Sequence, residues 1–299
     1  MPISDRGYQP YEGPRLPSRR NNWVITSLEL RRIWASLLVK IVLIIAGIWA
    51  ILRVAWVAGV GYFNVTLTER ASQDAAAVEQ LRQRLAQALS SDLVLAGIDG
   101  QLVFVILLTL AWGSGAIATD VRDRALQFYF AKPVTERTYL LGKITPLAVY
   151  CFFICVVPGT LIALVEGSLL QGQGLAASRS ALVLPAILYS LVLSVLLSVG
   201  SVGISSLSRN RLLTLAYWAG ILFVPLAVAG IVDLATQGEF VWLYLASPLT
   251  MARLLGRAIF RLSAEGPLQW YHSLLTLAAV CGGSIWLAWQ RLSKTEVVG

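Results

Sequence analysis

The sequence predicts an all-α protein that crosses a membrane with about six helices. Hydrophobic residues make up 57% of the 299 positions and charged residues only 13%, whereas a soluble domain carries about 25% charged residues. Six apolar stretches approach the length of about 20 residues that a helix needs to span a bilayer. Runs such as Ile41 to Ile51 are apolar on every face, which excludes the alternating strands of a membrane barrel. The predicted spans are Leu37–Tyr62, Leu102–Thr119, Ile144–Val165, Ala181–Leu207, Leu212–Ile231 and Tyr271–Gln290.

The distribution of lysine and arginine predicts the orientation of these spans. With the N-terminus inside, most basic residues fall on the cytoplasmic side, as the positive-inside rule requires. Both termini and the segment 120–143 are then cytoplasmic, and the segments 64–100 and 233–270 lie outside. The net charge of +8 matches contact with anionic lipid and gives no support to nucleic-acid binding. We expect a multi-pass protein of a bacterial cytoplasmic membrane.

The N-terminal region predicts a tail followed by an interfacial helix. Residues 1–22 are rich in proline and arginine and are expected to be a disordered cytoplasmic tail, while residues 23–299 form a single membrane domain. The first span is too long for the apolar region of a cleavable signal peptide. Trp23–Ala35 carries aromatic and basic residues typical of a membrane boundary. This helix is either a membrane anchor or a contact for a partner.

Two outer segments have amphipathic spacing. Apolar residues recur at helical spacing in the outer loop 64–100, which predicts a helix that lies on the membrane or caps a dimer. These are Val78, Leu81, Leu85, Leu89 and Leu93. Within 251–262, a second apolar stripe faces away from Arg253, Arg257 and Arg261, which predicts an interfacial helix.

The segment between the second and third spans is the strongest functional candidate. A short mixed-charge helix is expected from Val121 to Ala131, because Pro133 cannot continue a helix. Four residues fall on one side of this helix and predict a docking surface: Val121, Ala125, Phe128 and Tyr129.

This segment resembles the ABC-2 type permease family. The resemblance rests on an acidic-basic stretch at Ile117–Arg124, a short helix at Leu126–Phe130, a turn at Ala131–Val134 and the sequence Tyr139–Lys143. The sequence Ala-Leu-Gln-Phe-Tyr-Phe departs from the commonest family form. The resemblance implies a coupling helix that contacts an ATP-binding subunit, with Val121, Arg122, Arg124, Ala125, Phe128 and Tyr129 as contact residues. It also implies a second permease copy, as a homodimer or heterodimer, and an exporting function.

The chain lacks a phosphate-binding loop of its own. Gly142-Lys143 is followed by Ile144, and Arg137 stands where the first glycine of G-x-x-x-x-G-K-[ST] is needed. We therefore expect no enzymatic activity, with ATP and magnesium bound by a separate subunit. Cys151, Cys155 and Cys281 lie inside apolar spans and form no metal-ligand or disulfide pattern.

Two features inside the spans leave alternatives open. Arg53 lies about 20 Å along a helix from Lys40, so its charge either serves a polar pathway or extends to the outer headgroups. A serine stripe in the fourth span either packs helices or lines a polar pathway. It consists of Ser194, Ser198, Ser201 and Ser205.

An intramembrane enzyme and a membrane scaffold are the two alternatives to a permease. An intramembrane enzyme is disfavoured, because the single histidine, His272, lies at the edge of a span and no H-E-x-x-H motif is present. A membrane scaffold or assembly factor without transport remains the alternative to a permease. The sequence does not identify a transported substrate.

Overall fold

The computed structural model describes residues 19–70, 91–130, 134–169, 182–237, 239–263 and 266–293. Within these ranges all regular elements are helical, which confirms the predicted all-α fold. In chain order they are α1 (Arg19–Ala35), α2 (Leu37–Arg70), α4 (Ser91–Ala111), the 3-10 turn η1 (Gly113–Gly115), α5 (Ala118–Arg122), α6 (Ala125–Phe130), α7 (Glu136–Leu169), α9 (Val183–Ile204), α10 (Arg211–Thr236), the 3-10 helix η4 (Val241–Ala246), α11 (Pro248–Ile259) and α12 (Trp270–Ser293).

Six segments of the described chain are long and apolar enough to cross a membrane. They are α2, the segment 93–122 that joins α4, η1 and α5, and helices α7, α9, α10 and α12. The protein is therefore a polytopic α-helical membrane protein. Large apolar side chains remain exposed along one face of α2, including Leu37, Ile44 and Ile51. Such a row is unfavourable in water and is expected on a surface that faces lipid or another membrane helix.

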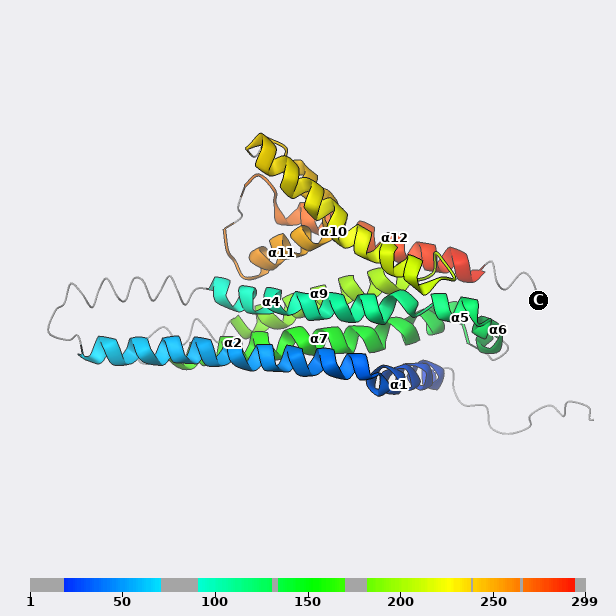
Figure 1. Cartoon of the computed structure of the whole chain (residues 1–299), viewed down its shortest axis with the longest axis horizontal. Coiled ribbons are helices and arrows are strands. Elements are labelled where there is room, and N and C mark those ends of the chain that lie inside the picture. Colours follow the sequence, from blue (N-terminus) through cyan, green and yellow to red (C-terminus); the bar gives the residue numbers. More distant parts are fainter. Residues whose placement is uncertain are drawn as a thin grey trace, which may run out of the picture.

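Helices α7 and α9 form the centre of the bundle. They pack extensively against each other, α4 contacts both of them, α1 and α2 lie on α7, and α12 lies on α9. Figure 1 shows α2, α4, α7 and α9 aligned with the long axis of the molecule, while α10 diverges from the bundle toward its own C-terminal end. Much of α9 is buried, and small residues such as Gly200 and Gly203 allow its neighbours to approach closely.

Two spans begin earlier than predicted because polar residues are accommodated inside them. Helix α4 begins at Ser91 rather than Leu102, and α7 begins at Glu136 rather than Ile144. The hydroxyl of Tyr189 donates a 2.7 Å hydrogen bond to Asp99 in α4, and Lys143 in α7 is paired with carboxylates. Asp99 and Lys143 interrupt the apolar pattern of the sequence, so the predicted spans begin after them although both charges have partners in the structure.

The predicted outer loop 64–100 is shorter than expected. Residues 64–70 belong to α2 and residues 91–100 to α4. Residues 71–90 lie outside the described residues, and so do the predicted stripe positions Val78, Leu81, Leu85 and Leu89. At the N-terminus, α1 begins at Arg19, inside the predicted tail, and residues 1–18 are not described.

Helix α11 packs into the bundle rather than lying only at its surface. Met251 and Leu255 are buried, and Gly256 packs so closely that an added Cβ would lie 2.6 Å from the ring of Tyr189. The guanidinium Nε of Arg253 lies 3.0 Å from Asp99 of α4. Arg261 follows the helix with φ 57° and is therefore not part of a continuous arginine face.

Candidate functional site

A break in the second span precedes the candidate site. Between α4 and α5 the chain forms the 3-10 turn η1 at Gly113–Gly115. Glycine is required at position 113, because a Cβ there would lie 2.2 Å from Oγ of Ser201 and 2.9 Å from the side chain of Leu147. The break therefore lies where the second span packs tightly against α7 and α9.

Side chains of α10 bind backbone carbonyls at this break. The 3-10 turn leaves the Ala111 carbonyl without its usual helical donor, and a guanidinium nitrogen of Arg211 donates to it. The hydroxyl of Thr214 donates a 2.6 Å hydrogen bond to the Ser114 carbonyl. The Ser114 carbonyl is buried and would be costly without a donor, so Thr214 of α10 stabilises the bent form of the second span.

The predicted coupling helix is a helical elbow of two short helices, which we call the elbow (residues 118–130). Helix α5 ends at Arg122 and α6 begins at Ala125. Arg124 lies between them with φ 54°, a left-handed conformation that interrupts a helix. The continuous helix predicted from Val121 to Ala131 is therefore wrong, and its predicted single face is divided between two axes.

An ion-paired cluster, which we call the clamp, holds the elbow to two other helices. The ammonium of Lys143 on α7 lies 2.6 Å from Glu29 on α1 and 2.7 Å from Asp120 on α5. All three residues are buried. Arg32 lies 3.7 Å from Glu29 at the exposed edge. The two carboxylates and two cations balance, so the clamp satisfies buried charges that would be costly alone.

Two tyrosines complete the clamp. The hydroxyl of Tyr139 donates a 2.7 Å hydrogen bond to Asp120, and the ring of Tyr129 packs edge-on against Tyr139 with ring centres 5.3 Å apart. The ammonium of Lys143 lies 5.8 Å from the centre of the Tyr129 ring, within the range of a cation–π interaction. Burial raises the pKa of the Tyr129 phenol. Tyr129 thus joins α6 to α7 within this chain.

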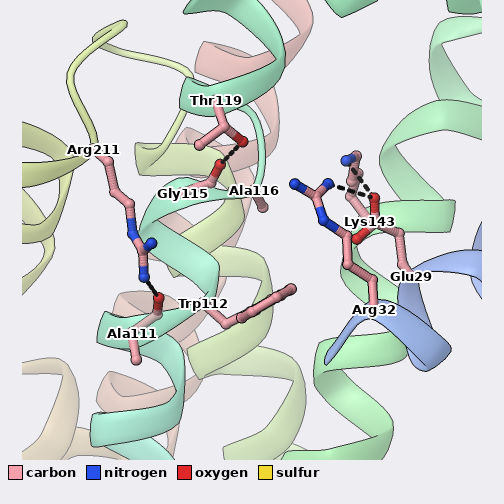
Figure 2. A pocket seen from close by; sticks show the side chains of 9 residues that line it. All are labelled: Glu29, Arg32, Ala111, Trp112, Gly115, Ala116, Thr119, Lys143 and Arg211. Carbon is pink, nitrogen blue, oxygen red and sulfur yellow. Dashed lines mark hydrogen bonds and ion pairs between the residues drawn. The ribbon is translucent and has the colours of Figure 1, made fainter. Parts of the chain in front are cut away.

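A polar cleft lies between the clamp and the break. Figure 2 shows Arg211 at Ala111 on one side of this cleft and Lys143, Glu29 and Arg32 on the other. The hydroxyl of Thr119 donates to the Gly115 carbonyl at 2.6 Å. The residues around the cleft are Glu29, Arg32, Ala111, Trp112, Gly115, Ala116, Thr119, Lys143 and Arg211.

Comparison with known families decides what kind of membrane protein carries this elbow. Residues 24–296 match the model of the ABC-2 family transporter proteins. The chain belongs to this family. Comparison with curated proteins finds no match. The protein is an ABC-2 permease, an integral membrane component of an ABC transporter, and the match covers α2 to α12 and most of α1.

The structure separates the predicted contact residues of the permease into two groups. Arg122 and Arg124 are exposed, as is Gln127. Val121 and Tyr129 instead pack partly against the core of the same chain, so only part of each side chain remains open for the predicted contact. Ala125 is half-buried, and the side chain of Phe128 lies outside what the structure describes.

Arg122 and Asp123 form an exposed pair at the bend. The guanidinium Nε of Arg122 donates a 2.8 Å hydrogen bond to Asp123, which lowers the pKa of that carboxyl. Exposed pairs of this kind contribute little to stability. Their place on the elbow, rather than their energy, makes them available to a partner.

The serine stripe of the permease is buried in this structure, and its hydroxyls are hydrogen-bonded. Each hydroxyl donates to a carbonyl of α9 itself, three or four residues earlier, and Oγ of Ser205 also accepts the Ile117 N–H at 3.0 Å. That N–H is freed by the break in the second span, and Ser201 lies against Gly113. All four serines are buried: Ser194, Ser198, Ser201 and Ser205.

Arg53 lies partly exposed on α2 with tryptophans beside it. Its guanidinium carbon lies 5.5 Å from the ring centre of Trp56. Within the described chain its Nε has no hydrogen-bond partner. The described residues around Arg53 offer an aromatic surface and no carboxylate, so the predicted membrane anchor accounts for more of these contacts than a polar pathway does.

The sequence analysis missed Glu29, Lys143 and Arg211 as site residues. Lys143 and Arg211 served as topology signals beside predicted spans, and Glu29 lies in the predicted interfacial helix. The one signal in the sequence is Lys143, a basic residue that lies inside α7 directly before its long apolar stretch. A charge in that position requires a buried partner, but sequence spacing does not identify which of the acidic residues supplies it.

Proposed function

We propose that this permease exports a substrate across a bacterial cytoplasmic membrane, using ATP hydrolysed by a separate ATP-binding subunit that docks on the elbow. The elbow lies at the end of the bundle predicted to be cytoplasmic by the positive-inside rule. Its exposed residues Arg122, Arg124 and Gln127 give this partner a polar contact surface. ATP and magnesium bind in the partner.

The clamp is the observation that carries this proposal. An isolated loop would absorb the movement of a docked partner, whereas Asp120 is bound to Lys143 and through it to Glu29. A displacement of the elbow is therefore passed to α1 and α7 together. Because α1 continues into α2, three of the helices in the bundle receive the movement. Two permease copies with two ATP-binding subunits form the proposed transporter, so that both elbows move together when nucleotide closes the partner subunits.

A charge reversal with a matched control tests the docking. Arg124 and Arg261 are both exposed arginines with positive φ shortly after a helix, and only Arg124 is on the elbow. Arg124→Glu should weaken co-purification of the ATP-binding subunit about tenfold, the loss expected when an interface contact of about 1.4 kcal/mol is removed. Arg261→Glu should leave it unchanged.

The result also separates a permease from a membrane scaffold. A non-transporting scaffold should lose no ATP-binding partner with Arg124→Glu, and its presence should not alter ATP hydrolysis. If both variants retained the partner and full ATP hydrolysis in the reconstituted complex, docking at the elbow would be wrong. Size-exclusion profiles of both variants establish that the membrane domain is intact.

A further inference from the structure

A groove between α7 and α12 lies apart from the elbow and the clamp. Both helices pack against α9 but make few contacts with each other, so α9 forms the floor between them. Buried residues of all three helices line the groove: Val199 and Val202 of α9, Leu140 of α7 and Ala288 of α12. The groove has a volume of about 230 Å³, which is less than the about 300–1,000 Å³ of pockets that enclose a whole ligand and leaves room for one slender apolar chain.

One end of the groove carries a fixed positive charge. The guanidinium carbon of Arg137, in the first turn of α7, lies 5.4 Å from the ring centre of Trp289 on α12. Arg137 is exposed and forms no ion pair within the described ranges. The other residues around the groove are apolar, apart from Gly203 in the floor. The groove thus combines an apolar channel with a single cation at its mouth.

Arg137 lies at the level of the bundle where lipid headgroups are expected. It lies at the start of α7 and beside the last turns of α12, at the end of the bundle predicted to be cytoplasmic. The apolar rim residues Leu141 and Ile285 are exposed, so the groove opens sideways at the level of the acyl chains. Cytoplasmic leaflets contain anionic lipids, and basic residues at this level bind their headgroups.

We propose that the groove binds an anionic phospholipid of the cytoplasmic leaflet, with its phosphate on Arg137 and one acyl chain between α7 and α12. Charge complementarity selects the headgroup, and the apolar floor accepts the chain. The stacking of Arg137 on Trp289 holds the guanidinium at the mouth and reduces the ordering cost of binding. This site is separate from the elbow and does not depend on an ATP-binding partner.

Native mass spectrometry of the purified full chain tests the site, with phosphatidylglycerol and phosphatidylcholine as probes. Wild-type protein should retain phosphatidylglycerol more strongly than phosphatidylcholine. Arg137→Gln should weaken phosphatidylglycerol binding about fivefold, the effect of one basic residue at a membrane surface. Arg209→Gln, which removes an exposed arginine outside the groove on the same predicted side, should leave binding unchanged.

A second variant tests the acyl chain. Ile285→Trp places a larger side chain at the exposed rim of the groove and should reduce the binding of both lipids while the size-exclusion profile stays unchanged. Equal phosphatidylglycerol binding by wild type and Arg137→Gln would overturn the proposal, as would equal losses in Arg137→Gln and Arg209→Gln. Unchanged lipid binding by Ile285→Trp would overturn the placement of the chain. A groove occupied by a second permease copy would retain no lipid in the wild type, which also contradicts the proposal.

Discussion

The ammonium of Lys143 on α7 lies 2.6 Å from the carboxylate of Glu29 on α1, although the two residues are 114 positions apart in the chain. The same ammonium lies 2.7 Å from Asp120. One lysine thus joins the interfacial helix, the elbow and the third span. Removing it leaves two buried carboxylates near each other without their shared cation.

Lys143→Met should therefore destabilise the permease by about 3–5 kcal/mol, the cost of breaking a buried ion pair from one side. Thermal unfolding in detergent, followed by size-exclusion chromatography, measures the loss. Lys40→Met removes an exposed lysine of α2 and is the control. Adding Glu29→Gln and Asp120→Asn to Lys143→Met should recover part of the stability, because no unpaired charge remains. A Lys143→Met protein as stable as the Lys40→Met protein would contradict the clamp.

Gly113 and Gly220 provide a matched pair for the break in the second span. A Cβ at Gly113 would overlap Ser201, whereas a Cβ at Gly220 in α10 meets nothing within 4 Å. Gly113→Ala should destabilise the protein by about 1–3 kcal/mol through overpacking. Gly220→Ala should be neutral or stabilising by up to about 1 kcal/mol, because alanine favours a helix. Gly113→Ala should therefore unfold at a lower temperature than Gly220→Ala. A higher unfolding temperature for Gly113→Ala would contradict close packing at η1.

Tyr189 tests how the half-buried carboxylate of Asp99 is accommodated in α4. Its hydroxyl donates the 2.7 Å hydrogen bond to Asp99, and its ring packs against Phe260 beyond the end of α11. Tyr189→Phe keeps the ring and removes the donor, which should cost about 1–3 kcal/mol. The exposed Tyr217→Phe is the control. Equal unfolding temperatures for the two variants would show that Asp99 does not need this donor.

Arg53 provides a test of function rather than stability. If its charge only anchors α2 at the outer headgroups, Arg53→Leu and Arg53→Lys should both keep ATP hydrolysis by the reconstituted complex and its stimulation by substrate within about twofold of wild type. A polar pathway predicts that the lysine variant remains active and the leucine variant does not. Loss of activity in Arg53→Leu alone, with normal membrane insertion, would contradict the anchor.

Much of the fold follows from the sequence, because long apolar helices are imposed by the bilayer itself. Polar residues inside those helices limit how accurately the helix ends can be predicted. Asp99 and Lys143 were read as helix boundaries, since their partners Tyr189 and Glu29 are distant in the chain. The sequence predicts a helix at the position of the elbow but does not predict its bend. The bend depends on the left-handed conformation of Arg124, and such a conformation is usually signalled by a glycine. The inward packing of Tyr129 depends on Tyr139 and Lys143, which only the tertiary structure brings together.

A photocrosslinking amino acid at position 127 tests the central claim most directly. Gln127 is exposed on α6 of the elbow, and Leu234 is exposed near the end of α10 at the opposite predicted side of the membrane. In membranes that contain the permease and its ATP-binding subunit, the probe at position 127 should form a covalent product with that subunit, and the probe at position 234 should not. A complex that co-purifies intact but gives no product from position 127 would contradict docking at the elbow.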